Sequence, residues 1–430
     1  MATTSERETL ALRRKVVGLL ERGKRRRREE EEEEGSVSVS VSVEGTKKAS
    51  TSRCFVASCF SRERVEAHVR FMLSGLKQLS PGFASLDASR PWLLYWVVHG
   101  LSLLGFEYER GDTGGEKLVP AAWYPYHEEV SEQLRSALER APNKRACLDF
   151  LGSCQNPSGG YGGGPQQLSH IATTYAAVAA LVIVGGKGAL EQVDKAATKE
   201  FFRKMQVRQG DQKGAFTVHN GGEVDMRACY LAMAVCRMLG LDTDFLDVEG
   251  MVEYIRRCQS YEGGFGGEPG NEAHGGYSYC AFAALSLVGK EDEVDLYQLL
   301  EWVSNRQQPI EGGFNGRTNK LVDSCYSFWQ GSLVCLVSDC YNQKFGADSC
   351  EAFHSEALQD WVLLCCQLDD GGLRDKPGTN PDYYHTCYSL SGLSLCFRIG
   401  APDEGKTDLL CNIRADKLSE VMTKAVQSFV

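Results

Sequence analysis

Asp323 and Cys325 are the two residues of this 430-residue chain whose types and spacing point most directly to chemistry. They lie at the start of the apolar stretch SCYSFWQGSLVCLV, which has the periodicity of a helix. Side chains two positions apart diverge within a helix but can converge where a helix begins. A carboxylate and a thiolate are both zinc ligands, although an aspartate here could also simply cap the helix. The pair therefore indicates either a helix cap or two ligands of a zinc site.

An internal repeat supplies a third ligand, His385. A glutamine followed by a glycine turn and an apolar helix recurs about every fifty residues, the spacing of stacked or circular repeat proteins, at Gln155, Gln206, Gln259, Gln307 and Gln367. Cys325 and His385 each lie 18 residues after the glutamine of their own repeat. They should therefore sit at the same height on neighbouring helices, whose axes lie about 8–10 Å apart. The spacing predicts a Zn²⁺ site formed by Asp323, Cys325 and His385.

The repeats predict an all-α fold. Five clear repeats and a fainter one at SRPWLLYWVVHGLSLLG give six helix pairs. Their simplest closure is an α/α toroid, a closed α-α barrel with parallel inner helices around a central cavity. The aromatic residues expected to line that cavity are Trp92, Tyr95, Trp96, Tyr175, Tyr230, Tyr277, Trp329 and Tyr388. Such a cavity fits a long apolar chain.

Basic residues near the predicted helix starts suggest that the apolar chain ends in a phosphate group. His274, Arg317 and Lys320 offer the mixed donors that suit an oligophosphate, and Tyr326 adds a phenol beside Cys325. His274 could instead serve packing, as could Gly276, Tyr277 and Cys280 in the same segment, and Arg227 could either line a pocket or pair with an outside acid. The glycine-rich segments GGYGGG and GGFGG lack the G-K-[ST] of a P-loop, so we interpret them as turns between helices.

The composition favours a globular protein over a nucleic-acid-binding or membrane-spanning one. The chain is 43% hydrophobic with a net charge of −10, which suits one large core and disfavours a general nucleic-acid binder. No apolar run is long enough to cross a bilayer. Most of the 17 cysteines fall within apolar helical patterns, so we expect reduced thiols in a cytoplasmic protein. KRRRREEEEEE followed by SVSVSVSV predicts that residues 1–52 form a low-complexity, solvated tail before a toroid domain at 53–430.

Five motifs, together with the ligand set, resemble the protein prenyltransferase beta-subunit family, and its farnesyltransferase branch most closely. They are DASRPWLLYW, GGEVDMR, EAHGGYSYC, GRTNKLVDSCYSFWQ and DYYHTCYSLSGLS, within a resemblance that covers about residues 55–400. The resemblance implies an enzyme that works as a heterodimer with an alpha subunit and requires Zn²⁺ and Mg²⁺. It implies transfer of farnesyl from farnesyl diphosphate to the cysteine of a C-terminal CaaX sequence, through a zinc-bound thiolate.

The resemblance also implies a role for each matching residue. The zinc ligands would be Asp323, Cys325 and His385, with Tyr326 and Lys320 also catalytic. The diphosphate contacts would be His274, Arg317, Lys320 and Tyr326, and the isoprenoid wall Arg227, Tyr230, Gly276, Tyr277, Cys280 and Trp329. Trp92, Trp96 and Tyr384 would contact the peptide, and Asp375 would help to hold magnesium. The tail and the residues around Asn380 and Pro381 depart from the family pattern.

Three other functions compete with this interpretation. A type I protein geranylgeranyltransferase beta subunit would share the toroid and the zinc site, but Trp92 as a cavity floor and Asp375, where a lysine is expected in that relative, favour the farnesyl enzyme. A triterpene cyclase would need a D-x-D-D motif, which the chain lacks. A non-catalytic interaction platform would leave the three candidate ligands as a coincidence.

Overall fold

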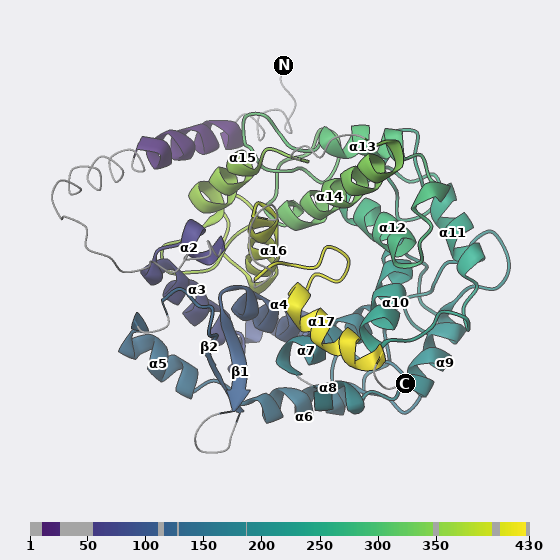
Figure 1. Ribbon diagram of the computed structural model, residues 1–430, viewed down its shortest axis with the longest axis horizontal. Coiled ribbons are helices and arrows are strands. Elements are labelled where there is room, and N and C mark those ends of the chain that lie inside the picture. Colours follow the sequence, from purple (N-terminus) through teal and green to yellow (C-terminus); the bar gives the residue numbers. More distant parts are fainter. Residues whose placement is uncertain are drawn as a thin grey trace.

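The computed structural model describes residues 11–25, 55–110, 116–126, 129–185, 187–346, 352–397 and 405–426. Its centre is a ring of six inner helices, shown in Figure 1: α4 (Arg90–Leu103), α7 (Ile171–Gly185), α10 (Met226–Leu239), α12 (Gly275–Leu287), α14 (Tyr326–Phe345) and α16 (Tyr383–Leu395). Each inner helix packs against the next, and α16 packs against α4. The predicted six-membered α/α toroid is therefore confirmed.

Outer helices alternate with the inner ones along the chain. They are α3 (Arg62–Ser74), α6 (Lys144–Cys154), α9 (Lys195–Met205), α11 (Val248–Arg257), α13 (Leu296–Ser304) and α15 (Ser355–Asp360), the last continuing as a π-helix over Trp361–Cys366. The remaining elements are α2 (Phe55–Cys59), α5 (Glu132–Glu139), α8 (Lys187–Glu191), α17 (Ala415–Val426), 3-10 helices at Pro81–Ser89 and Glu291–Glu293, and an antiparallel hairpin of β1 (Phe106–Arg110) and β2 (Glu116–Pro120). None of the helices in the described ranges has the length and apolar character needed to cross a membrane.

The repeated glutamine fastens each repeat to the next. The Gln259 side chain donates from Nε2 to the carbonyl of Asp295 and accepts from the amide of Asp295, both at 3.0 Å. Asp295 is the N-cap of α13, so the glutamine ties one repeat to the start of the next outer helix. Gln206 and Gln307 bind the caps of α11 and α15 in the same way. These bonds explain why a glutamine recurs at this spacing.

The glycine that follows each glutamine is required by the same junction. Gly263 has a φ of 100°, and a Cβ there would lie 2.2 Å from the carbonyl oxygen of Gln298 on α13. A side chain is therefore excluded by backbone conformation and by close approach together. The equivalent glycines, each with a positive φ and a backbone carbonyl in the way, are Gly159, Gly214, Gly312 and Gly371.

The last and first repeats close the ring through a variant of this junction. Gln367 Oε1 lies 3.1 Å from Nε2 of His68 on α3, and Nδ1 of the same ring accepts from the Gly372 amide at 2.9 Å. Burial lowers the pKa of His68 to about 4, so the ring is neutral and can use one nitrogen as donor and the other as acceptor.

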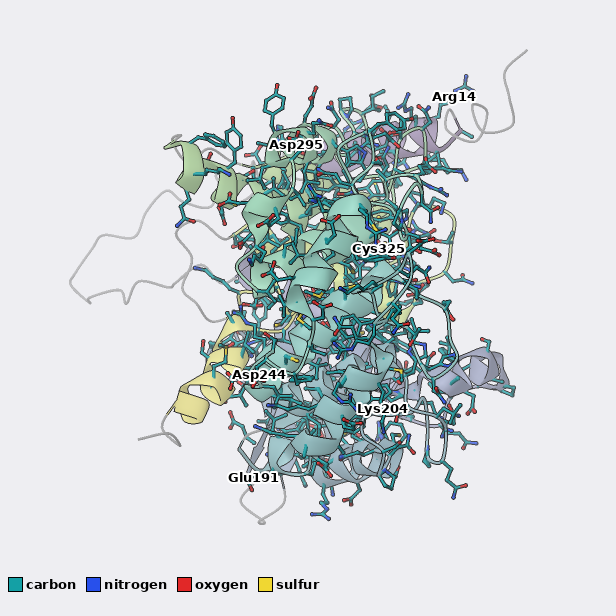
Figure 2. The ribbon with its side chains drawn as sticks, turned by 90° about the vertical axis from the view of Figure 1, so that its right-hand side faces the viewer. Arg14, Glu191, Lys204, Asp244, Asp295 and Cys325 are labelled. Atoms are coloured by element: carbon teal, nitrogen blue, oxygen red, sulfur yellow. The ribbon has the colours of Figure 1, made fainter. Side chains whose placement is uncertain are left out.

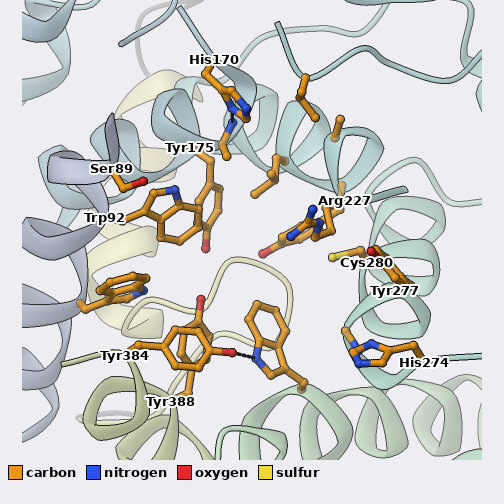
Figure 3. Close-up of a pocket in the computed structure, with 18 of the residues that line it drawn as sticks. Ser89, Trp92, His170, Tyr175, Arg227, His274, Tyr277, Cys280, Tyr384 and Tyr388 are labelled. Carbon is orange, nitrogen blue, oxygen red and sulfur yellow. Dashed lines mark hydrogen bonds between the residues drawn. The ribbon is translucent and has the colours of Figure 1, made fainter. Parts of the chain in front are cut away.

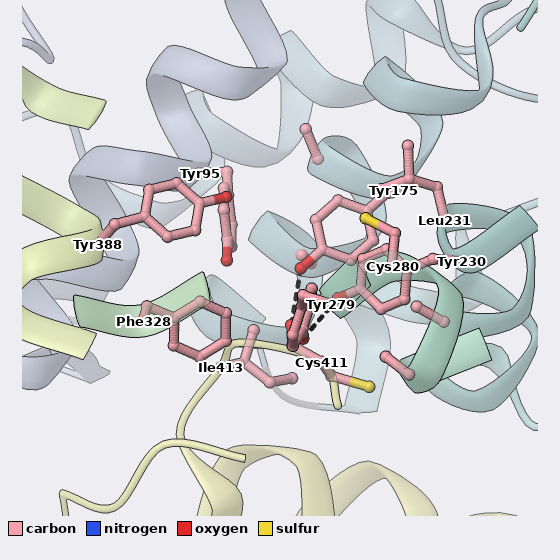
Figure 4. Close-up of a cluster of buried hydrophobic side chains, with 14 of the residues drawn as sticks. Tyr95, Tyr175, Tyr230, Leu231, Tyr279, Cys280, Phe328, Tyr388, Cys411 and Ile413 are labelled. Atoms are coloured by element: carbon pink, nitrogen blue, oxygen red, sulfur yellow. Dashed lines mark hydrogen bonds between the residues drawn. The ribbon is translucent and has the colours of Figure 1, made fainter. Parts of the chain in front are cut away.

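Residues 405–414 close one end of the ring. Tyr95, Tyr175 and Tyr279 on three inner helices donate their hydroxyls to the carbonyls of residues 412, 411 and 409, at 2.7, 2.7 and 2.8 Å. Figure 4 shows these tyrosines together with Cys411 and Ile413 of the segment. We call this segment the plug. Figure 2 shows the ring from the side, with α17, which follows the plug, on the face opposite to the one nearer Cys325. The toroid therefore has a closed floor and an open mouth, where α12, α14 and α16 begin.

Residues 11–25, which we predicted to belong to a solvated tail, form a helix instead. Leu12 and Val16 are buried, Arg13 pairs with Glu311 at 3.0 Å, and Lys24 pairs with Asp360 at 3.5 Å. The tail prediction is therefore wrong for this helix, because its apolar residues find a docking surface on the outer ring. The rest of the predicted tail lies outside the described residues.

Candidate active site at the mouth of the toroid

A cavity of about 680 Å³ occupies the centre of the ring above the plug (Figure 3). Its aromatic lining includes Trp92, Trp96, Tyr175, Tyr230, Tyr277, Trp329, Tyr384 and Tyr388. Tyr95, which we expected in this lining, does not belong to it; its ring lies fully buried between α4 and the plug, where its hydroxyl donates to the carbonyl of residue 412. The walls fit an extended apolar chain, since these aromatic rings line the cavity.

The three predicted metal ligands meet at the mouth. One donor atom each of Asp323, Cys325 and His385 lies within 4.8 Å of the other two. His385 Nε2 is 3.3 Å from Asp323 Oδ1. That oxygen also accepts from the Cys325 amide at 2.9 Å, immediately before α14 begins. The N-cap of α14 is therefore Cys325 and not Asp323, but the bond from the Cys325 amide to the Asp323 carboxylate brings that carboxylate beside the thiol.

Asp382 orients the histidine of this cluster. It is the N-cap of α16, where Oδ1 accepts from the His385 amide at 2.7 Å and Oδ2 lies 2.7 Å from Nδ1 of the ring. A carboxylate on the second ring nitrogen is the usual partner of a metal-binding histidine. Burial lowers the pKa of His385, but the Asp323 and Asp382 carboxylates outweigh it and raise the pKa to about 9.

The donor set fits a zinc ion. Cys325 is only 4% exposed, and burial together with the Asp323 charge raises the pKa of its thiol well above the ordinary value. One carboxylate, one thiol and one imidazole thus lie close together, and a second carboxylate, that of Asp382, lies on the other side of the imidazole ring. Sulfur, nitrogen and carboxylate oxygen together suit Zn²⁺, and three protein donors leave a coordination position for a substrate.

Three of the four predicted diphosphate contacts line the same cavity. His274 caps α12 by accepting from the Gly276 amide through Nδ1 at 3.1 Å, and its Nε2 lies 3.0 Å from the Tyr326 hydroxyl. Burial lowers the pKa of His274, and the neighbouring Arg317 lowers it further. Lys320, the fourth predicted contact, is exposed and lies outside the cavity lining.

All six residues predicted to form the isoprenoid wall lie along the same cavity. Arg227, Tyr230, Gly276, Tyr277, Cys280 and Trp329 all line the cavity. Arg227 pairs with Asp225 through Nε–Oδ1 at 2.9 Å and Nη2–Oδ2 at 2.6 Å, while its guanidinium lies 5.7 Å from the centre of the Tyr277 ring. It is therefore both paired with an acid and part of the wall.

The residues predicted to touch a peptide lie on the far side of the cavity. The Trp92 ring centre is 5.6 Å from that of Tyr175 and 5.8 Å from that of Trp96, which in turn lies 5.5 Å from Tyr384. The Tyr384 hydroxyl accepts from Trp329 Nε1 at 3.1 Å. One connected set of rings thus runs from the deep wall to the helix that carries His385.

Asp375, the predicted magnesium residue, lies outside the cavity lining but beside the three candidate metal ligands. Its carbonyl accepts from the Ser324 amide at 2.8 Å, while its carboxylate binds Lys376 and Thr379. Burial raises the pKa of this carboxyl, but Lys376 and Thr379 outweigh it, so that the pKa is lowered overall. Asp375 is therefore a charged carboxylate near the mouth.

Sequence reasoning missed several residues of the site. Asp382 was overlooked, although an aspartate three residues before a helical histidine is a capping signal. His170 also lines the cavity, and it lies 15 residues after Gln155, as His274 lies 15 after Gln259. The other unpredicted lining residues are Leu86, Ser89, Ala172, Val218, Glu223, Ala228 and Leu231.

Comparison with known proteins gives this site a family. A family model for the prenyltransferase alpha-alpha toroid domain matches residues 64–413. The chain is 39% identical over 398 residues to the protein farnesyltransferase subunit beta of Arabidopsis thaliana, covering 80% of this chain and 75% of that protein. The chain belongs to the protein prenyltransferase beta-subunit family.

Other members of the prenyltransferase beta-subunit family are almost as similar. The protein farnesyltransferase subunit beta of Pisum sativum is 38% identical, with 77% of this chain and 83% of that protein covered. The geranylgeranyl transferase type-1 subunit beta of Arabidopsis thaliana is 33% identical, with 78% and 85% covered. A solved structure of Candida albicans protein geranylgeranyltransferase-I complexed with GGPP shares the fold, with a TM-score of 0.64, 20% identity, and 84% of this chain and 98% of that chain covered. The resemblance noted in the sequence is thus confirmed.

Proposed function

We propose that this prenyltransferase is the catalytic beta subunit of a protein farnesyltransferase. With an alpha subunit, it would transfer farnesyl from farnesyl diphosphate to the cysteine thiol of proteins ending in a CaaX sequence. The observation that carries the proposal is the position of the Asp323, Cys325 and His385 donors at the mouth of a cavity with aromatic walls. Relatives named as farnesyltransferase beta subunits support it.

Different residues of the site would bind the isoprenoid chain, the diphosphate and the metal during alkylation of a thiol. The aromatic cavity would hold the farnesyl chain, with its diphosphate at the mouth beside His274, Arg317 and Tyr326. Asp323, Cys325 and His385 would hold the metal. When bound, Zn²⁺ supplies a Lewis acid that keeps a substrate thiol deprotonated at neutral pH, where a free thiol with a pKa near 8.5 is mostly protonated.

The chemical step forms one bond and breaks another. The substrate sulfur bonds to the first carbon of the farnesyl chain as the bond from that carbon to the diphosphate oxygen breaks. Negative charge then develops on the departing diphosphate, which donors fixed at the mouth can stabilise. Arg317 offers a fork of N–H groups for these oxygens, and the Tyr326 hydroxyl, 3.0 Å from His274, offers another donor. Asp375, beside the mouth, would help to hold Mg²⁺ on the diphosphate.

The second candidate is a type I protein geranylgeranyltransferase beta subunit, favoured by the similarity to that subunit of Arabidopsis thaliana. Trp92 argues for the shorter isoprenoid, since its indole occupies space in the cavity lining against Tyr175. Asp375 points the same way, because we expect a lysine there in the geranylgeranyl enzyme.

The test is transfer to a peptide by the chain purified together with its alpha subunit. We expect farnesyl transfer to a CaaX peptide, little geranylgeranyl transfer, and no product with a peptide in which serine replaces the cysteine. Preference for geranylgeranyl diphosphate would establish the second candidate. Absence of transfer from either diphosphate would refute both.

A further inference from the structure

Two arginines line the cavity, and the structure holds them in different ways. Arg227 is locked, because Asp225 binds its guanidinium at 2.9 and 2.6 Å and also accepts from its backbone amide at 2.8 Å. The Asp225 side chain is only 11% exposed, so the acid that holds Arg227 is buried although the Arg227 side chain itself is 57% exposed. Within the described part of the chain, the Arg317 side chain makes one hydrogen bond, from Nη1 to Glu272 Oε2 at 2.7 Å, and the side chains of Arg317 and Glu272 are 39% and 49% exposed. Arg317 is thus the cavity arginine whose partner can be exchanged.

The backbone around this pair is fixed even though the ion pair is exposed. Glu272 precedes α12, and Arg317 belongs to the turn of the next repeat. The two segments are joined by a bond of 2.7 Å from the Gly275 amide to the Gly316 carbonyl. The Gly316 backbone also packs closely on Tyr326, since a Cβ at Gly316 would lie 2.2 Å from the Tyr326 hydroxyl oxygen. Exchange of partners therefore involves the side chains alone.

Arg317 lies between the central cavity and a depression on the outer surface. It lines the central cavity, whereas Glu272 lines a separate outer depression of about 580 Å³ together with Thr318 and Asn319. A guanidinium can bind a carboxylate on the outer side or diphosphate oxygens on the inner side. A half-exposed ion pair is weak and is readily given up to a more highly charged anion.

We propose that Glu272 is a positioning residue that holds Arg317 at the rim and competes with the diphosphate for its guanidinium. This inference rests on the proposed function. In it, binding of a prenyl diphosphate transfers Arg317 from Glu272 to the ligand, and departure of inorganic pyrophosphate returns it. Glu272 thereby weakens binding of both the substrate and the leaving product, and speeds release of the product.

The test measures binding to the heterodimer with three probes: farnesyl diphosphate, inorganic pyrophosphate and farnesol, which lacks the diphosphate. Glu272→Gln should tighten the first two by about two- to five-fold, the range that loss of a half-exposed ion pair produces, and should leave farnesol unchanged. Glu268→Gln is the matched control, since it removes a carboxylate four residues earlier that binds Gln212 instead. It should change none of the three.

The Arg317→Ala background separates competition from simple repulsion. There, Glu272→Gln should have no further effect, because the competed group is gone. A two-fold or greater tightening that persists in this background would show repulsion alone and overturn the inference, as would unchanged or weaker diphosphate binding by Glu272→Gln. A wild-type heterodimer that fails to bind farnesyl diphosphate would instead refute the proposed function itself.

Discussion

Replacing Asp382 with asparagine should lower zinc affinity without unfolding the site. One carboxylate oxygen accepts from the His385 amide and the other lies 2.7 Å from Nδ1 of the ring. Asparagine can keep the first contact and cap α16 about as well as aspartate. Its amide group, however, would face Nδ1 with a donor instead of an acceptor. The ring would then favour the tautomer with its proton on Nε2, the nitrogen that faces Asp323.

The size of the effect follows from that change of tautomer. Nε2 must be unprotonated to bind a metal, and loss of such a second carboxylate typically costs about 10–100-fold in metal affinity. We therefore expect Asp382→Asn to weaken zinc binding by about that factor. The melting temperature without added zinc should change little, because the cap remains.

The assay is competition for zinc between the purified heterodimer and a chelator of known affinity. Asp295→Asn serves as the control, since Asp295 caps the outer helix α13 and is not one of the clustered donors. It should leave zinc affinity unchanged. Wild-type zinc affinity in a folded Asp382→Asn variant would refute the idea that this carboxylate prepares His385 for the metal.

The repeat architecture and the donor cluster could be predicted from the sequence because each leaves a side-chain signal. The junction needs a glutamine to bind the next helix cap and a glycine where a carbonyl approaches, and both recur visibly. Because Cys325 and His385 each lie 18 residues after the glutamine of their own repeat, they are expected at the starts of adjacent inner helices, and their side chains do meet there.

The plug that closes the ring below the cavity could not be predicted in this way, and from the sequence we expected Trp92 to form the floor instead. The plug offers its main-chain carbonyls to three tyrosine hydroxyls, and any residue could supply such acceptors. The N-terminal helix was missed for another reason. Its apolar positions, among them Leu12 and Val16, precede the charged block that begins at Lys24, and such a block is typical of a solvated segment.

Three further predictions follow from the junctions and the cavity. Gln206→Ala removes three side-chain hydrogen bonds of a buried glutamine and should lower the free energy of unfolding by about 2–4 kcal/mol. Gln155→Ala should lower it by about 1 kcal/mol, because the hydrogen bonds of Gln155 are longer, and equal losses in denaturant titrations would contradict the role of Gln206 in joining the repeats. Trp92→Thr should shift kcat/KM toward geranylgeranyl diphosphate by about tenfold or more, because overpacking costs about 1–3 kcal/mol, and an unaltered ratio would mean that another residue sets the depth. Asp375→Lys should blunt the stimulation of transfer by Mg²⁺, so a variant with full magnesium dependence would remove Asp375 from that role.

Metal content and farnesyl transfer, measured together in Cys325→Ala, test the proposed active site most directly. Cys236→Ala is the matched control, since Cys236 is a buried cysteine of α10 that is not one of the clustered donors. We predict that Cys325→Ala loses both zinc and transfer yet still binds farnesyl diphosphate, while Cys236→Ala keeps all three properties. Stoichiometric zinc and undiminished transfer in Cys325→Ala would contradict the assignment of Asp323, Cys325 and His385 as the catalytic metal site.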